Sequence, residues 1–187
     1  MAVIYGGKEL AGAFRTVRKN TIQVAEDLPE EKYGYVAAPE ARSVAQMLTH
    51  VAISPRIWEE IDKKNVTTLV GFDFFRLIDE FKAEEAKTRS KAEIVELLGT
   101  EGEKFASWLE SLTPEFLAET VTEGDGKTQK TRFERLLGAK EHEMHHRAQL
   151  MLIERQLGIV PHVTKKFQER LAQLKAARAS AQSKVAS

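Results

Sequence analysis

Three histidines of this 187-residue chain have a spacing that suits metal chemistry. His142 and His146 are four residues apart in a strongly helical segment, so their imidazoles stack on one helical face and can reach the same ion. His50 lies upstream, in another predicted helix. Two ligands from one helix and a third from another leave part of the coordination sphere open to water or substrate, as catalytic sites require. The spacing therefore predicts a metal-dependent helical enzyme.

Helical periodicity directs all three histidines toward the interior of a bundle. At about 100° per residue, His142 and His146 fall away from the polar stripe of their helix, and His50 aligns with the apolar Ile57 and Ile61. The polar stripe comprises Lys140, Glu143, Arg147 and Glu154. Converging buried imidazoles are best satisfied by a cation, which neutral rings can bind without burying further charge. The alternative is that each histidine is an ordinary hydrogen-bonded residue of the core or its boundary.

The sequence also predicts, with less support, the positions of three further side chains near these histidines. His145 lies off the face of the histidine pair and is expected at its boundary, behind the ligands. Gln149, one turn beyond His146, is placed to orient a ligand or a bound water, although an internal Gln is more often satisfied by backbone groups. His162 follows the predicted helix end and is expected on the surface.

The run from His142 to His146 also matches H-E-x-x-H, the zinc-binding pattern of many metalloproteases. This pattern is short and arises often by accident. Such proteases typically use a downstream third ligand and an edge strand that holds an extended peptide, and the sequence predicts no persuasive strand. A metalloprotease is therefore the less favoured alternative, and His50 is the better third ligand.

Composition restricts the class of protein. The chain has 28 basic and 28 acidic residues, a net charge of zero, which disfavours nucleic-acid binding. It has no cysteine, so His, Asp and Glu are the available side-chain ligands and any thiol chemistry needs an external thiol. No apolar run is long enough to cross a membrane, and residues 1–8 do not resemble a signal peptide. We expect a soluble, cytoplasmic protein that does not bind membranes.

Apolar periodicity predicts four long amphipathic helices, of which three begin with a capping box. A first helix covers residues 10–28, and the capping boxes begin at Ser43, Ser90 and Thr131. The second helix extends to about Ile61 with a kink at Pro55, and the last ends at Leu157, before Gly158. Shorter helices are predicted over Phe72–Phe81 and after Pro114, with a loop or short hairpin over residues 120–130.

These elements predict an all-α protein, an up-and-down four-helix bundle with a short extra helix and a C-terminal helical extension. Residues 1–160 form the bundle in this prediction. Residues 161–187 add a helix to about Ala177 and a frayed tail, within the same single domain.

The sequence resembles the DinB-like family of metal-binding four-helix bundles, from the first helix to about Leu157. The resemblance rests on His50 in Met47-Leu48-Thr49-His50-Val51 and on the run from His142 to Gln149, where Ala148 replaces a common Gly. It implies metal-ligand roles for His50, His142 and His146. It also implies a homodimer, and an activity of the kind that characterised relatives show: transfer or isomerisation that depends on a low-molecular-weight thiol.

Our leading hypothesis is that the three histidines bind a divalent metal ion. Zinc is the metal most expected in such a site, and nickel and iron are alternatives. The ion would activate water or a low-molecular-weight thiol for hydrolysis of, or S-transfer to, a small-molecule substrate. One alternative is a non-enzymatic stress protein in which the metal stabilises the bundle or is sensed. Another is a metal-free interaction module that dimerises through Phe72–Phe81.

Overall fold

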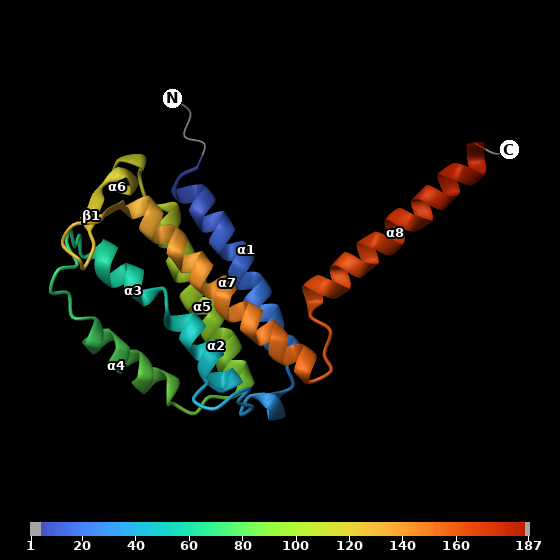
Figure 1. Cartoon of the computed structure of the whole chain (residues 1–187), viewed down its shortest axis with the longest axis horizontal. Coiled ribbons are helices and arrows are strands. Elements are labelled where there is room, and N and C mark those ends of the chain that lie inside the picture. The colour runs from blue at the N-terminus through green and yellow to red at the C-terminus, as the bar shows by residue number, and fades with distance from the viewer. Residues whose placement is uncertain (1–4, 186–187) are drawn as a thin grey trace.

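The computed structural model describes residues 5–185, and four long helices form its body (Figure 1). They are α1 (Gly7–Asp27), α2 (Val44–Ile53), α5 (Lys91–Glu110) and α7 (Arg132–Gln156). The predicted capping boxes are present: Ser43, Ser90 and Thr131 each accept a hydrogen bond from the backbone N–H three residues later. The predicted four-helix bundle is therefore confirmed.

The order of the helices around the bundle follows from their contacts. α1 packs against α5 and α7, and α2 packs against the same two helices, so α5 and α7 separate α1 from α2. The connection from α2 to α5 includes α4 (Phe74–Glu85), which lies outside the bundle against α2. With α4 included, successive long helices alternate in direction (Figure 1). This arrangement places α2 and α7, the helices that carry the three histidines, side by side.

Short elements complete the connections. After the break at Ser54–Pro55 the chain continues as α3 (Arg56–Trp58) and one π-helical segment, η2 (Glu59–Lys63), so the predicted kink at Pro55 is confirmed. The remaining elements are the 3-10 turn η1 (Glu30–Lys32), α6 (Pro114–Ala118), and an antiparallel hairpin of β1 (Thr120–Thr122) and β2 (Gln129–Thr131). Among the described residues, no helix has the length and apolarity that a bilayer span needs.

The apolar core has two principal parts. One lies between α1, α2, α5 and α7 and includes the fully buried Leu48, Leu98 and Leu150. The other lies toward the opposite end of the bundle, where the rings of Phe14 and Phe105 pack edge to face. Between these parts, α1 and α7 carry buried charged residues, and these are described with the site.

The C-terminal helix α8 (His162–Val185) leaves the bundle (Figure 1). The chain turns at Gly158, whose φ of 78° suits glycine, and α8 begins after Pro161. It continues beyond the predicted end near Ala177. The predicted surface position of His162 is wrong: the ring is 6% exposed, because the first turn of α8 folds against the end of α1 and its Nε2 lies 3.1 Å from Asn20 Oδ1.

Candidate metal centre

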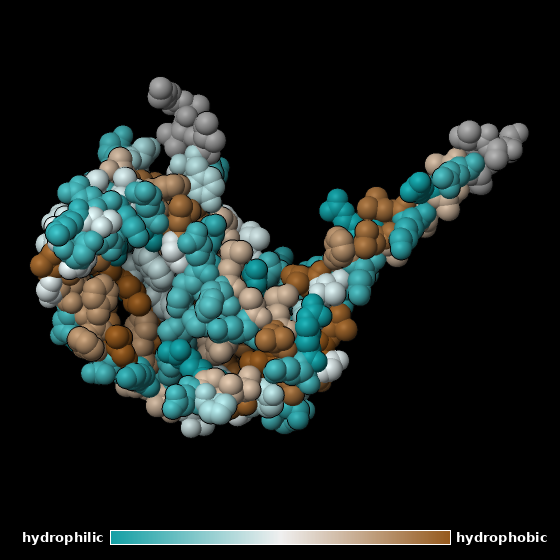
Figure 2. Space-filling model, viewed as in Figure 1, coloured by the Kyte–Doolittle hydropathy of each residue, from teal (hydrophilic) through white to brown (hydrophobic). Residues whose placement is uncertain are grey.

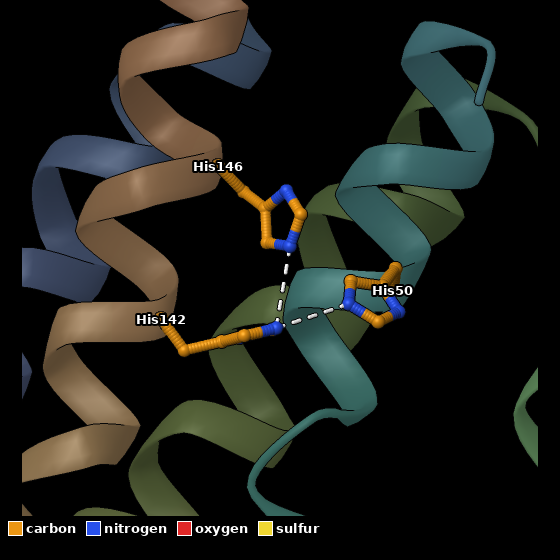
Figure 3. Close-up of side chains that lie close together, drawn as sticks. All are labelled: His50, His142 and His146. Atoms are coloured by element: carbon orange, nitrogen blue, oxygen red, sulfur yellow. Dashed lines mark hydrogen bonds between the residues drawn. The ribbon is translucent and has the colours of Figure 1, made fainter. Parts of the chain in front are cut away.

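The three predicted histidines converge where α2 faces α7 (Figure 3). His142 Nε2 lies 3.2 Å from His50 Nε2 and 3.2 Å from His146 Nε2. One nitrogen from each ring lies within 4.8 Å of the other two. Ligands about 2.0–2.1 Å from a tetrahedral zinc ion stand roughly 3.3 Å apart, so the spacing of these nitrogens matches the size of a metal ion.

The partners of the rings indicate that lone pairs meet at this point. His50 Nδ1 is 2.8 Å from a carboxylate oxygen of Glu85, and His146 Nδ1 is 2.9 Å from the amide oxygen of Gln149. Both partners are acceptors, so each Nδ1 carries the proton and each neutral ring turns an unprotonated Nε2 toward His142. His142 can donate one proton at most. A cation satisfies all three nitrogens, and the donor set therefore fits a metal.

A carboxylate and an arginine fix the orientation of His50. Glu85, at the end of α4, is buried and accepts from His50. Arg42 donates to the same carboxylate, with its Nε 2.6 Å from Oε2. A carboxylate behind a histidine ligand fixes the tautomer and raises the basicity of the metal-binding nitrogen. Glu85 and Arg42 were not among the residues predicted from the sequence, because their contacts with His50 and with each other join distant segments.

An amide orients His146 in the same way. Gln149 accepts from His146 through its oxygen, and its Nε2 lies 3.1 Å from His145 Nε2. The expected position of His145 behind the converging rings is thus observed, and Gln149 contacts a histidine side chain rather than the backbone. His142 differs from the other two, because its Nδ1 is buried without a hydrogen-bond partner among the described residues.

Burial keeps the three imidazoles neutral. Desolvation, followed by the neighbouring His146 and His50, lowers the pKa of His142 to about 3. Burial and the positive charge of Arg42 lower the pKa of His50, and Glu85 opposes this in part. Burial also lowers the pKa of His146. Neutral rings are the form that binds metal, so at neutral pH the cluster is in the state that a metal ion requires.

A cavity of about 670 Å³ opens beside His146. One wall is apolar and includes Met47, Leu152 and Ile153, and the charged residues at its edge include Arg42 and Lys82. This volume is in the range of small-molecule sites. His146 can therefore be reached from a pocket of the size that a small substrate needs.

A buried ion pair lies in α1 and α7 next to the histidine cluster. Arg18 donates to both oxygens of Glu143 at 3.0–3.1 Å and to the backbone carbonyls of Leu98 and Val51. The two residues are 3% and 2% exposed. Gly102 of α5 makes room, because a Cβ there would lie 2.7 Å from Arg18 Cγ. Through these contacts the pair joins α1, α2, α5 and α7 around the site.

The prediction of a polar stripe on the last helix is therefore wrong for Glu143 and Glu154. Both are buried, and Glu154 is fully so. The periodicity of α7 is weak because the helix packs against neighbours on more than one side, and buried charge occupies positions that an amphipathic pattern assigns to solvent. This burial also removes Glu143 as a freely placed general base, since both of its oxygens are held by Arg18.

The fold and the site together define a helical bundle with an open cluster of three histidines. The model of the DinB superfamily matches residues 13–150, and the chain belongs to this superfamily. The match contains all three histidines and ends before α8. A search of curated proteins found no match.

Three solved structures have the same fold. One is YfiT from Bacillus subtilis, which is described as a probable metal-dependent hydrolase with an unusual four-helix bundle topology. It aligns with a TM-score of 0.65 and 17% sequence identity, and the alignment covers 85% of this chain and 91% of YfiT. The DinB-like protein YjoA from the same organism aligns with a TM-score of 0.60 and 23% sequence identity, and the alignment covers 80% of this chain and 92% of YjoA. An uncharacterised protein from Clostridium difficile 630 aligns with a TM-score of 0.60 and 14% sequence identity, and the alignment covers 82% of this chain and 98% of that protein.

Proposed function

We propose that the protein is a metal-dependent hydrolase of small molecules, with one divalent ion held by His50, His142 and His146. The observation that carries the proposal is the convergence of three Nε2 atoms, of which two belong to rings whose Nδ1 protons are fixed by Glu85 and Gln149. The description of YfiT as a probable metal-dependent hydrolase supports the reaction class. Zinc is the metal we expect first, and nickel or iron are compatible with three imidazoles.

The three ligands leave room for a reacting molecule. Three protein ligands with a free position are typical of catalytic zinc sites, whereas structural sites close the sphere with a fourth protein ligand. Apart from these three histidines, no Asp, Glu or His of the described residues joins the cluster. The bound ion supplies a lowered pKa for a coordinated water or thiol, which makes a nucleophile at neutral pH.

The surrounding residues divide the remaining tasks. Glu85 and Gln149 hold the rings of His50 and His146, and burial keeps all three rings neutral. The apolar wall of the cavity seats the body of a substrate and excludes water. The same nucleophile site accepts an external thiol in place of water, so S-transfer is the second candidate, and the absence of cysteine from the chain requires that this thiol be a cosubstrate.

Metal analysis of the purified protein tests the proposal. We expect about one equivalent of a divalent metal in the wild type, and loss of this metal in both His50→Ala and His146→Ala. His162→Ala is the matched control, since it removes a buried histidine outside the cluster and should keep the metal. Wild-type protein that retains no zinc, nickel or iron after loading would refute the proposal.

Activity assays then separate hydrolysis from S-transfer. Ester, amide and lactone substrates are tested with the metal-loaded protein alone, and electrophiles are tested with glutathione, mycothiol or bacillithiol. Turnover without thiol that disappears in His146→Ala supports hydrolysis. Turnover only with a thiol assigns the S-transferase reaction, and a loaded protein inactive in both screens favours a structural or sensing role of the metal.

A further inference from the structure

The cavity beside His146 has an unpaired cation in its wall. Its lining includes four charged residues, Glu40, Arg42, Lys82 and Glu85. Arg42 and Glu85 satisfy each other, since the Nε and Nη2 atoms of Arg42 lie 2.6 and 3.3 Å from the two carboxylate oxygens. Lys82, in the last turn of α4, is exposed and has no ion-pair or hydrogen-bond partner among the described residues. Its ammonium group is therefore free to bind a ligand.

Lys82 and Arg42 belong to the same side of the cavity. Lys82 and Glu85 are three residues apart in α4, so they share one face of the helix, and both line the cavity. Because Glu85 holds Arg42, the guanidinium lies about one helical turn along α4 from Lys82. Arg42 Nη1 forms no hydrogen bond within residues 5–185, and neither does the amide nitrogen of Gln46, whose oxygen accepts from the backbone of Ser43. Three side chains of the lining thus have unused N–H donors.

Most acceptors of the lining are already engaged. Glu85 accepts from Arg42 through both oxygens. The side-chain oxygen of Gln149 lies 2.9 Å from His146 Nδ1. Glu40 is the exception, since it is exposed in the loop before α2 and has no partner in the described part of the chain. The unused hydrogen-bonding capacity of the lining is therefore mainly that of donors, which suits a ligand with acceptor oxygens.

The charge of the site favours an anion once a metal ion is bound. The two basic and the two acidic residues of the lining cancel. Three neutral histidines leave both positive charges of a divalent ion uncompensated, so the loaded site has a net charge of about +2. This field attracts an anion and repels a cation. Only this charge depends on the proposed function, and the free ammonium group of Lys82 does not.

The rest of the wall is apolar. Met47 and Ile153 are 7% and 3% exposed, whereas Leu152 is 58% exposed and lines the cavity with them. Apolar and polar residues lie side by side at the surface over the end of α7, brown beside teal in Figure 2. A hydrocarbon segment of a ligand would remove the side chain of Leu152 from water, which is favourable. The lining therefore complements a molecule with an anionic end and an apolar body.

We propose that the cavity binds small molecules that carry a carboxylate on an apolar body, with Lys82 and the free Nη1 of Arg42 as the carboxylate subsite. The ammonium and the guanidinium donate charge-assisted hydrogen bonds to the carboxylate. Met47 and Leu152 contact the hydrocarbon part, and the molecule then lies beside His146. That the bound molecule is the substrate rests on the proposed function, to which the subsite adds the substrate class.

NMR titration of the full-length protein with hexanoate and with hexanamide tests the subsite. The two probes share the apolar body and differ in charge, and we expect hexanoate to bind the zinc-loaded protein at least about tenfold more tightly. Lys82→Gln should weaken hexanoate binding by about three- to fivefold, the range for an exposed ion pair, and leave hexanamide binding unchanged. Glu40→Gln is the matched control, because it also replaces a charged residue of the lining by an amide, and it should leave hexanoate affinity unchanged or raise it. Circular dichroism confirms that each variant is folded.

The same titration of metal-free protein separates the subsite from the metal ion. A carboxylate that binds the ion directly would lose its affinity with the metal, whereas the three- to fivefold effect of about this size from Lys82→Gln should persist after treatment with EDTA. This effect in a protein that fails to bind metal would refute the proposed function and leave the subsite in place. Absence of saturable hexanoate binding, equal affinity for the two probes in the loaded protein, no effect of Lys82→Gln, or weaker hexanoate binding in Glu40→Gln would each overturn the inference.

Discussion

The histidine cluster and the Arg18–Glu143 pair share α7, which supplies two of the three histidines and the glutamate. The hydrogen-bonding groups of the pair all have partners, whereas those of the cluster do not. In the ion pair, each carboxylate oxygen has a donor and the guanidinium also reaches two carbonyls. In the cluster, three neutral nitrogens face one another, and His142 Nδ1 has no hydrogen-bond partner within residues 5–185. The first arrangement is complete without a ligand, whereas the second is completed by a cation. In the proposed function, the adjacent residues His142 and Glu143 of one helix therefore serve metal binding and structure separately.

Loss of a cluster histidine should produce the largest change. His142→Ala removes the central ring, so we expect loss of bound metal and of all metal-dependent turnover, with little change in unfolding free energy of the metal-free protein. Elemental analysis and denaturant unfolding measure the two quantities. His145→Ala, a histidine three residues along the same helix, is the control and should keep the metal. Full metal retention in His142→Ala would contradict the three-histidine centre.

Loss of Glu143 should do the reverse. Glu143→Ala leaves the guanidinium of Arg18 buried without its counter-charge, and we expect the unfolding free energy to fall by about 3–5 kcal/mol. Urea unfolding of the metal-free protein measures this. Glu141→Ala, two residues away and exposed, should change stability by less than about 0.5 kcal/mol. Equal stability of the two variants would show that the ion pair is not structurally important.

Glu154 is a third case, a buried carboxylate that forms no ion pair among the described residues. Both of its oxygens lack hydrogen-bond partners among the described residues, and burial, with Asp27 nearby, raises its pKa to about 7. Lys165 and Arg155 oppose the shift in part. The folded state therefore holds this proton more tightly than the unfolded state, whose pKa is about 4.5.

It follows that the contribution of Glu154 to stability is full below about pH 4.5 and is lost as pH rises through 7. Glu154→Gln should leave stability unchanged near pH 4 and raise it by roughly 2–3 kcal/mol at pH 8 relative to the wild type. Unfolding measured across this pH range tests the sign. Glu169→Gln, exposed on α8, is the control and should show no such trend. A variant less stable at pH 8 would contradict the assignment.

The smallest expected effect concerns the support of the cluster. Glu85→Gln keeps an acceptor near His50 Nδ1 but removes the charge, so we expect metal affinity to fall by about 10- to 100-fold with the metal site intact. Competition with a chromophoric chelator measures the affinity. Glu84→Gln, the neighbouring residue on α4, pairs with Lys87 and Arg89 and should leave the affinity unchanged. Equal affinities would place Glu85 outside the metal centre.

The sequence predicted the elements that local chemistry determines. Capping boxes at Ser43, Ser90 and Thr131 involve residues three apart, and the i, i+4 spacing of His142 and His146 is equally local, so both could be identified without a fold. The prediction that His50 converges with this pair required only the face of the helix on which His50 lies. The apolar Ile57 and Ile61 indicated that face. The metal-ligand role of the three histidines stays a prediction.

Other features depend on contacts that periodicity does not encode. Glu143 and Glu154 occupy buried positions of a helix with neighbours on more than one side, and the first is accommodated by an arginine 125 residues earlier. Glu85 reaches His50 only because α4 returns along α2. His162 is buried because the turn at Gly158 brings the start of α8 to α1. Each outcome is set by pairing between distant segments.

The close approach of Arg18 to Gly102 has a consequence for protein engineering. Replacing a helical glycine by alanine ordinarily stabilises a helix by about 1 kcal/mol. At Gly99, three residues earlier in α5, a new Cβ would have no described neighbour within 4 Å outside the adjoining backbone, so alanine should stabilise the helix. At Gly102 the same methyl group would displace Arg18 from the carboxylate of Glu143. A thermal melt of Gly99→Ala beside Gly102→Ala should therefore show shifts of opposite sign, and a routine thermostabilising substitution becomes a probe of the ion pair.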